Sequence, residues 1–179
     1  MDDFRKLARD PKHRRRFEKL LFLAAQRNDD DHVAERLSWG IDPNCTFGKG
    51  RTPLIACVRS PSAAAATVRA LLKGGADPDL SDESGLNALD YARNKLYKLL
   101  ATGYKPRKSP NLDENNQLKL CTEEQAEFDE MRRDVNDPEY VRMWWKDRLR
   151  AARRSFNDPA QYEQIVEILE AAGGLTDRK

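Results

Sequence analysis

The chain contains few of the residues from which catalytic and metal sites are usually built. Its 179 residues include two histidines, His13 and His32, and three cysteines, Cys45, Cys57 and Cys121. None of them falls into a CxxC, HxxxH or HExxH spacing, so the sequence indicates neither a zinc site nor a disulfide framework. Acid–base or nucleophilic catalysis needs a base beside its partner group, and no motif supplies one. We therefore expect no enzyme activity, no metal and no cofactor.

Long hydrophobic runs are also missing. The apolar runs at residues 20–25 and 63–66 are far shorter than the roughly 18 to 20 residues that cross a bilayer. The N-terminus starts with Asp2 and Asp3 and continues with basic residues, without the apolar segment of a secretory signal. We expect a cytoplasmic protein that has no membrane partner.

Neither sign of charge is in large excess. Lys and Arg number 32 against 30 Asp and Glu, for a net charge of +2, in a chain that is 39% hydrophobic and 35% charged. This balance is typical of a soluble protein and argues against a globally basic nucleic-acid binder. Two basic stretches, residues 14–16 and 142–154, keep nucleic acid as an alternative partner. Most such stretches are solvated helix faces, and no aromatic side chains are interleaved at a spacing that suits base stacking.

Internal repetition decides the fold class. Residues 40–44, Gly-Ile-Asp-Pro-Asn, return as Gly-Ala-Asp-Pro-Asp at residues 75–79, a step of 35. Residues 50–54, Gly-Arg-Thr-Pro-Leu, return as Gly-Leu-Asn-Ala-Leu at residues 85–89, again a step of 35. Two independent markers with one period indicate a repeat architecture.

The residues between these markers predict pairs of helices. Residues 54–59 and 64–73 have helical periodicity. Thr52 and Pro53 suit a helix start, because the hydroxyl caps free N–H groups and proline at the first position loses no hydrogen bond. Gly75 suits the position after a helix, where a left-handed residue ends it. Each period is therefore expected to be helix, turn, helix and loop.

These markers resemble the ankyrin repeat, whose pattern runs Gly-x-Thr-Pro-Leu-His-x-Ala-Ala, then a second helix, then Gly-Ala-Asp-x-Asn. The segments that carry the resemblance are residues 50–57 and 71–77. Ile55 stands where the family usually has a histidine, and it cannot make the hydrogen bonds that this histidine makes between repeats. A degenerate first repeat is similar at residues 21–25, and a third repeat begins at Gly85.

The resemblance implies an all-α ankyrin-repeat solenoid of about four helix pairs, with hairpin-like loops and an acidic insertion before the last repeat. We expect a basic helical extension at residues 1–16 and repeats 1 to 3 at residues 17–106. The acidic insertion is expected at residues 107–139 and a degenerate closing repeat at residues 140–179. The second helix of the third repeat is expected to be short, at residues 95–100.

The insertion and the closing repeat each have a helix signal. Between residues 111 and 139 there are ten acidic and three basic side chains. A capping box at residues 122–125, followed by Phe128 and Met131 on one face, predicts a short amphipathic helix there. In the closing repeat, Asp158 and Pro159 predict the start of a helix.

Two cysteines lie within the repeats. Cys57 falls at a small-residue position of the first helix, so we expect a buried and unreactive thiol. Cys45 lies in a loop after Pro43, where we expect its side chain to be exposed.

The resemblance also implies where a partner binds, namely at the loop tips and the ends of the first helices. The candidate contact residues are Gly48, Lys49, Arg51, Glu83, Ser84 and Leu86 in the loops, and Arg59, Ser60, Arg93 and Asn94 at the helix ends. The first hypothesis is a monomeric protein–protein adaptor, or an inhibitor of a partner enzyme. The alternative is a basic nucleic-acid-associated factor.

Overall fold

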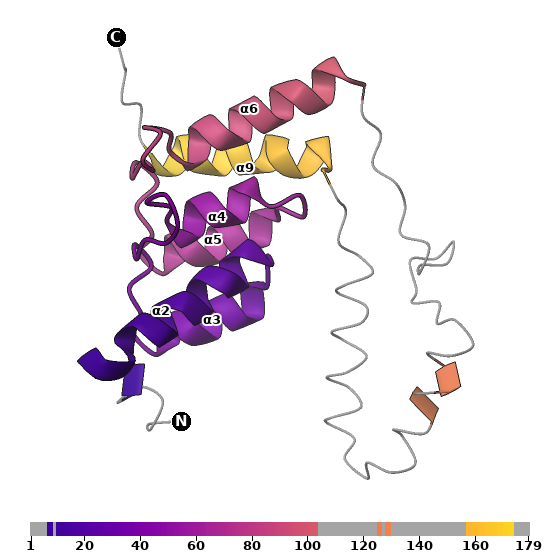
Figure 1. The fold of residues 1–179 in the computed structure, drawn as a ribbon. Coiled ribbons are helices and arrows are strands. Elements are labelled where there is room, and N and C mark those ends of the chain that lie inside the picture. Colours follow the sequence, from indigo (N-terminus) through magenta and orange to yellow (C-terminus); the bar gives the residue numbers. More distant parts are fainter. Residues whose placement is uncertain (1–6, 9, 104–124, 127, 130–156, 174–179) are drawn as a thin grey trace. The chain divides into compact units, whose positions relative to one another are not determined.

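A computed structural model describes residues 7–8, 10–103, 125–126, 128–129 and 157–173. In these residues it contains six labelled helices: α2 (Pro11–Gln26), α3 (Asp30–Ser38), α4 (Pro53–Arg59), α5 (Ala65–Lys73), α6 (Ala88–Ala101) and α9 (Pro159–Ala172) (Figure 1). The described part has no strand beyond one isolated antiparallel bridge between Phe47 and Arg51. All six helices belong to one compact unit, and residues 125–126 and 128–129, which are helical, belong to a second.

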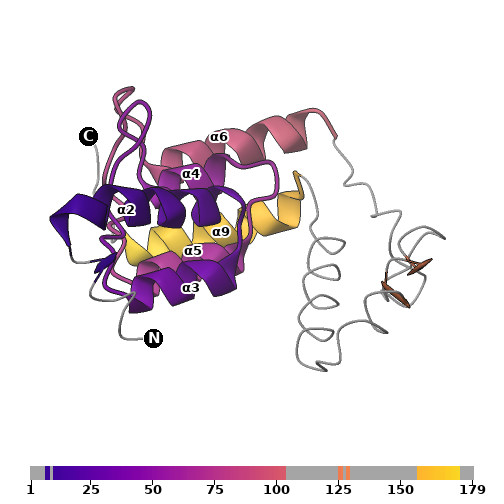
Figure 2. The same ribbon diagram turned by 60° about the horizontal axis from the view of Figure 1, so that its bottom comes forward.

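The helices stack in pairs, as the repeat period predicts. Helix α2 packs on α3, α4 on α5 and α6 on α9. The first helices α2, α4 and α6 form one row, and α3, α5 and α9 form a second row beside it (Figures 1 and 2). The main contacts of each pair are with the neighbouring pairs, which is the arrangement of a solenoid. The prediction of an all-α solenoid is confirmed.

The third pair differs from the prediction in its second member. Helix α6 runs without a break through residues 95–100, which the sequence assigned to a separate short helix. No glycine or proline interrupts α6, so nothing ends it before Thr102. Helix α9 packs against both α6 and α5 and so takes the place of the second helix in this pair. The described residues therefore form three helix pairs, and α9, which was predicted in the closing repeat, is the second helix of the third pair.

Several predictions concern residues outside the described part of the chain. These are the insertion at residues 107–139 apart from four helical residues, the stretch at 140–156 of the closing repeat, and residues 1–6 of the N-terminal extension. In the described part of that extension, residues 7–8 are helical and precede α2. Helix α2 begins at Pro11, so residues 11–16 are the first turns of the first repeat's own helix.

The predicted helix starts are formed by the expected caps. Thr52 Oγ1 accepts a hydrogen bond from the Ile55 N–H at 3.2 Å, and Pro53 is the first residue of α4. The Asp158 side chain accepts from the Ala160 N–H at 3.1 Å at the start of α9. These bonds satisfy N–H groups that have no partner within the helix.

The core lies between the two rows of helices. Its largest fully buried apolar side chains are Leu21, Val33, Leu54, Ile55, Val58, Val68, Leu71, Tyr162, Ile165 and Leu169. Burial of these side chains is the main stabilising contribution, at roughly 1.5–3 kcal/mol for each large aliphatic residue. The residues come from both rows and from all three pairs, so each repeat depends on its neighbours for its core.

The two cysteines in the repeats are both buried free thiols. Cys57 is fully buried, as predicted, and burial raises the pKa of its thiol to about 12. The prediction that Cys45 is exposed is wrong, because the residue is only 6% exposed. The loop folds back onto α2, where the Cys45 thiol lies 3.9 Å from the Glu18 carbonyl oxygen, and burial raises the pKa of Cys45 to about 12.

Asn28 joins the first helix pair to the second. Its Nδ2 donates to the Cys57 carbonyl at 3.3 Å, and its Oδ1 accepts from the Cys57 thiol and the Ala64 N–H, each at 3.0 Å. The residue is 4% exposed and has a φ of +54°, a left-handed conformation that asparagine tolerates well. Asn28 thus supplies hydrogen bonds between repeats in a chain where Ile55 cannot.

Helix α9 is joined to the second pair by polar contacts at its N-terminal end. Tyr162 Oη donates to the Ser60 carbonyl at 2.8 Å and lies 3.4 Å from the Val58 carbonyl oxygen. Gln161 Oε1 accepts from the Ala65 N–H at 3.2 Å. The Asn157 N–H donates to a further carbonyl of the same turn, that of residue 61, at 2.6 Å. These contacts fix the register of α9 on the stack.

Candidate functional site

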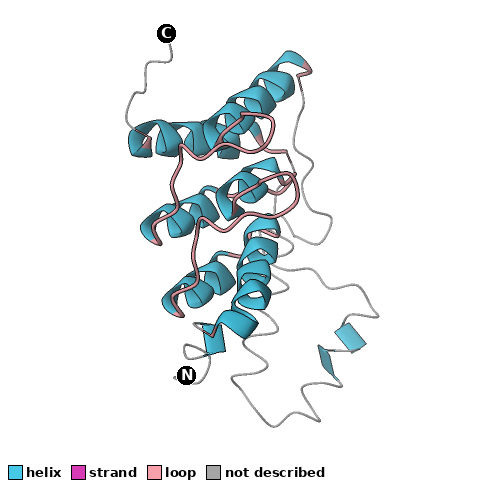
Figure 3. Cartoon of the chain, turned by 60° about the vertical axis from the view of Figure 1, so that its left-hand side comes forward, coloured by secondary structure: helices cyan, strands magenta, loops and turns pink. Residues whose placement is uncertain are grey.

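Two hairpin-like loops project on the same side of the stack, next to the first helices (Figure 3). We name them finger 1 (residues 41–52) and finger 2 (residues 76–87). In finger 1, Phe47 and Arg51 exchange both backbone hydrogen bonds at 2.9 Å. In finger 2, the Asp82 N–H donates to the Leu86 carbonyl at 3.0 Å. The hairpin-like loops predicted from the repeats are therefore present.

The two fingers are hydrogen-bonded to each other at the base and near the tip. At the base, Asn44 Oδ1 accepts from the Asp77 N–H at 2.8 Å, and Asn44 Nδ2 donates to the Gly75 carbonyl at 3.2 Å. Near the tip, the Glu83 N–H donates to the Lys49 carbonyl at 3.1 Å. These contacts hold the fingers as one edge with a defined spacing.

A buried carboxylate organises the space between finger 2 and α6. Asp82 Oδ2 accepts from Tyr91 Oη at 2.7 Å, and its Oδ1 accepts from the N–H groups of Ser84 at 2.8 Å and Leu86 at 3.5 Å. Burial acts to raise the pKa of Asp82, but these hydrogen bonds, with the charge of Arg51, outweigh it and lower the pKa below its usual value. The side chain is therefore ionised at neutral pH.

Arg51 reaches this carboxylate from finger 1. Its Nε lies 4.0 Å from Asp82 Oδ2, and the side chain is 28% exposed. The Nε atom itself is buried and makes no hydrogen bond. Arg51 thus carries its charge between the fingers with at least one donor unused.

Two further guanidinium groups lie over aromatic rings on this side. The guanidinium carbon of Arg59, at the end of α4, is 4.6 Å from the centre of the Tyr91 ring. That of Arg15, on α2, is 3.8 Å from the centre of the Phe47 ring, and Arg15 Nη2 donates to the Thr46 carbonyl at 3.0 Å. Cation–π contacts of this kind contribute about 0.5–1 kcal/mol at exposed sites and restrict the side chain.

The structure brings most of the predicted contact residues to the finger side. The exposed ones on the fingers are Gly48, Lys49, Glu83 and Ser84, and Arg51 and Leu86 are half-buried. Arg59 is exposed at the end of α4, and Asn94 is exposed in the middle of the uninterrupted α6 instead of at a helix end. Two other residues are placed differently. Ser60 is only 8% exposed, and Arg93 is ion-paired with Glu170 of α9 at 2.6 Å, which directs it toward the second row of helices.

Sequence reasoning missed four residues of this surface. They are Phe47, Asp82 and Tyr91, to which the arginines are linked, and Arg15, which the sequence indicated only as part of the basic stretch at residues 14–16 and not as a contact of finger 1. No motif identifies Arg15, because its partner lies in a loop about 30 residues further along the chain. Asp82 and Tyr91 stand next to predicted positions, but their pairing depends on how finger 2 folds against α6.

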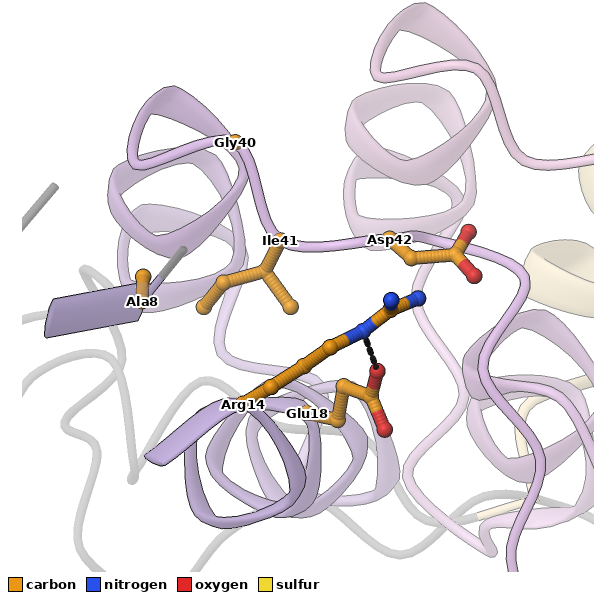
Figure 4. Close-up of a pocket in the computed structure, with 6 residues that line it drawn as sticks. All are labelled: Ala8, Arg14, Glu18, Gly40, Ile41 and Asp42. Atoms are coloured by element: carbon orange, nitrogen blue, oxygen red, sulfur yellow. Dashed lines mark hydrogen bonds and ion pairs between the residues drawn. The ribbon is translucent and has the colours of Figure 1, made fainter. Parts of the chain in front are cut away.

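The basic run Arg14-Arg15-Arg16 is partly neutralised. Arg14 Nε lies 2.8 Å from Glu18 Oε1, and Arg15 Nη1 lies 3.3 Å from Glu18 Oε2. The hydrogen bond and charge of Glu18 raise the pKa of Arg14, with a smaller contribution from Asp42. Figure 4 shows Arg14 crossing a pocket of about 290 Å³ toward these carboxylates. The other residues that line this pocket are Ala8, Gly40 and Ile41.

The described residues contain no group of three or more His, Cys, Asp or Glu side chains that could hold a metal ion. Within the same part of the chain, no helix is both long and apolar enough to cross a membrane.

Comparison with known proteins agrees with the fold. The family model for ankyrin repeats, in three copies, matches residues 21–109, about half of the chain. Helix α9 lies beyond the matched residues, although it packs in the third pair. No curated protein matches the chain. Ankyrin repeats generally serve as protein–protein interaction modules, and the family is typically non-enzymatic. On the repeat markers, the stacked helix pairs and the family model together, the chain belongs to the ankyrin repeat family.

Proposed function

We propose that the chain is a small adaptor, or an inhibitor of a partner enzyme, that acts by occupying another protein. It contacts this partner through the fingers and the ends of the first helices. The proposed contact residues are Lys49, Arg51, Arg59, Ser60, Glu83, Ser84, Leu86, Arg93 and Asn94. Of these, Ser60 has a buried side chain, so it contributes by shaping the turn at the end of α4 and not by direct contact.

The observation that carries this proposal is the connection between the two fingers. The Glu83 N–H to Lys49 carbonyl bond and the Arg51–Asp82 contact hold the tips side by side, while the Lys49 and Glu83 side chains are exposed. A surface that is ordered before binding loses little conformational entropy when a partner docks. Exposed side chains on a rigid edge are well suited to recognising a protein.

The nucleic-acid alternative has weaker support. Arg14 and Arg15 share Glu18, so the basic run on α2 offers less free charge than its sequence indicates. The net charge of the chain is only +2. Because non-specific nucleic-acid affinity comes from the number of neutralised phosphates, a surface with few free cations binds weakly.

The proposal includes a monomer that works in the cytoplasm. Cys45 and Cys57 are free thiols in the described structure, which suits a reducing compartment. The three helix pairs bury their core without a second chain.

The test is affinity capture with the full chain as bait. We would reverse the charges at the finger tips with Lys49→Glu and Glu83→Lys together, because both side chains are exposed and neither is bonded to the core. The matched control reverses Arg69 and Glu167, which are exposed on α5 and α9 in the second row.

Proteins that co-purify with the wild-type chain and the control, but not with the finger variant, would support binding through the fingers. The same proteins retained by the finger variant, or lost equally from both variants, would contradict it. Urea midpoints of the variants check that each one folds.

A further inference from the structure

We propose that the finger side binds an acidic peptide segment of the partner protein through the guanidinium groups of Arg15, Arg51 and Arg59, which we name the arginine stripe. This inference rests on the proposed function and adds the chemistry of the partner. The three side chains come from α2, finger 1 and the end of α4, and direct contacts connect them.

The first half of the stripe runs along finger 1. The Arg15 guanidinium lies 3.8 Å from the centre of the Phe47 ring and donates to the Thr46 carbonyl. Phe47 in turn is paired with Arg51 by both backbone hydrogen bonds of the antiparallel bridge. The ring of Phe22 on α2 packs 5.2 Å from the Phe47 ring and fixes the finger against the helix.

The second half runs from finger 1 to the end of α4. Arg51 Nε lies 4.0 Å from Asp82 Oδ2, which accepts the hydrogen bond from Tyr91 Oη at 2.7 Å. The Tyr91 ring lies beneath the Arg59 guanidinium at 4.6 Å. Arg15 therefore contacts the side chain of Phe47 and Arg51 is bonded to its backbone, while Arg51 and Arg59 are both linked to the Asp82–Tyr91 pair.

The stripe has unused hydrogen-bonding capacity. Each guanidinium carries five N–H donors. In the described structure the exposed Arg59 makes no hydrogen bond, and Arg51 reaches solvent with the part of its side chain that is not buried, since the side chain is 28% exposed and only its Nε is enclosed. A planar guanidinium matches a carboxylate with two parallel hydrogen bonds, and the rings beneath Arg15 and Arg59 already restrict their motion. A carboxylate ligand would therefore gain two charge-assisted bonds at a small entropic cost.

The charge around the stripe favours a peptide with spaced carboxylates. The three guanidinium groups of the stripe have two carboxylate partners, Glu18 beside Arg15 and Asp82 beside Arg51, while the exposed Arg59 has none among the described residues. The rest of the fingers carries Lys49 together with the carboxylates Asp42, Asp77, Asp79 and Glu83, so the attraction for an acidic partner comes from the stripe itself and not from a net positive surface. The carboxylates of Asp82 and Glu83, however, lie among the arginines and repel a backbone that carries a charge at every step, as nucleic acid does. An acidic peptide can place uncharged residues opposite Asp82 and Glu83.

The experiment measures fluorescence anisotropy of labelled probes with the full chain. The probes are an oligo-glutamate peptide in which glycines separate the glutamates, an oligo-glutamine peptide with the same spacing and a duplex DNA. The test variant carries Arg51→Gln and Arg59→Gln, and the matched control carries Arg69→Gln and Lys73→Gln, which remove the same charge from exposed positions of α5.

We expect oligo-glutamate to bind and oligo-glutamine not to bind. The double change in the stripe should weaken oligo-glutamate binding by about tenfold or more, because it removes hydrogen bonds between charged groups. The control should change it by less than about twofold. Arg59→Lys, which keeps the charge but loses the planar fork, should fall between the wild type and Arg59→Gln.

Three results would overturn the inference: no binding of oligo-glutamate, equal weakening in the stripe and control variants, or tighter binding of duplex DNA that also depends on the stripe. The last would assign the surface to nucleic acid. If oligo-glutamate fails while the finger-tip variant still abolishes partner capture, only the acidic chemistry is wrong and the proposed function stands.

Discussion

Replacing Tyr162 by phenylalanine tests how α9 is held in the third helix pair. The Tyr162 side chain is fully buried, and its hydroxyl donates to the Ser60 carbonyl at 2.8 Å. The ring of phenylalanine fills the same space, so the change removes the hydrogen bond and leaves the packing intact.

The size of the effect follows from what remains at the Ser60 carbonyl. This oxygen also accepts from the Ala63 N–H at 3.2 Å, so it is not left without a partner. The Val58 carbonyl, at 3.4 Å from the hydroxyl, makes only a weak contact. We therefore expect a loss of about 1 kcal/mol, near the mean for a buried hydrogen bond. Tyr162→Ala also removes the ring and should cost about 3–5 kcal/mol.

The assay is urea denaturation followed by circular dichroism, with the free energy of unfolding obtained from the midpoint and the slope. Tyr97→Phe is the matched control, because Tyr97 lies on α6 and is 75% exposed. It should change the free energy of unfolding by less than about 0.5 kcal/mol. If Tyr162→Phe lowers the free energy of unfolding no more than Tyr97→Phe does, the Tyr162 hydroxyl is not bonded to the Ser60 carbonyl at the end of α4.

Three further substitutions test the packing and the polar contacts. Asn28→Gly keeps the left-handed backbone but removes the side-chain bonds between the first two pairs, and it should cost about 1–3 kcal/mol in the same urea assay; an unchanged midpoint would contradict the role of Asn28. Leu71→Ala should cost roughly 2–5 kcal/mol because Leu71 is fully buried, and Leu72→Ala should cost less because Leu72 is half-buried; equal losses would show that the helix face is misassigned. Because the pKa of Asp82 is lowered by folding, its contribution to stability is present above its unfolded pKa of about 3.9 and is lost as pH falls through the folded pKa. Tyr91→Phe removes one of its donors, so the decline of the urea midpoint with acid should be smaller than in the wild type, and an identical decline would contradict this assignment.

The repeat stack could be predicted because its signals are local and periodic. Thr52 with Pro53 caps α4, and Gly75 takes a φ of +91° after α5, as the markers indicate. Helix α9 was predicted as an element, but its place was not. A period of 35 residues cannot show that a helix far along the chain packs against α6, because this depends on tertiary contacts such as those of Tyr162.

The candidate site was predicted in part for the same reason. Exposed loop-tip residues such as Lys49 and Glu83 follow from their positions in the repeat. The arginine contacts do not, because Arg15 over Phe47 and Arg59 over Tyr91 each join residues from different repeats or elements. Sequence spacing predicts the charge and exposure of each position, but it does not predict which distant residue a side chain contacts in the folded chain.

The most direct test of the central claim is hydrogen–deuterium exchange of the full chain, alone and with the protein that it captures. Binding through the fingers predicts slower amide exchange at residues 46–51 and 81–86, together with the end of α4 near Arg59. It predicts little change in α5 and α9, which form the second row. Protection confined to α5 and α9, with the fingers unchanged, would contradict it.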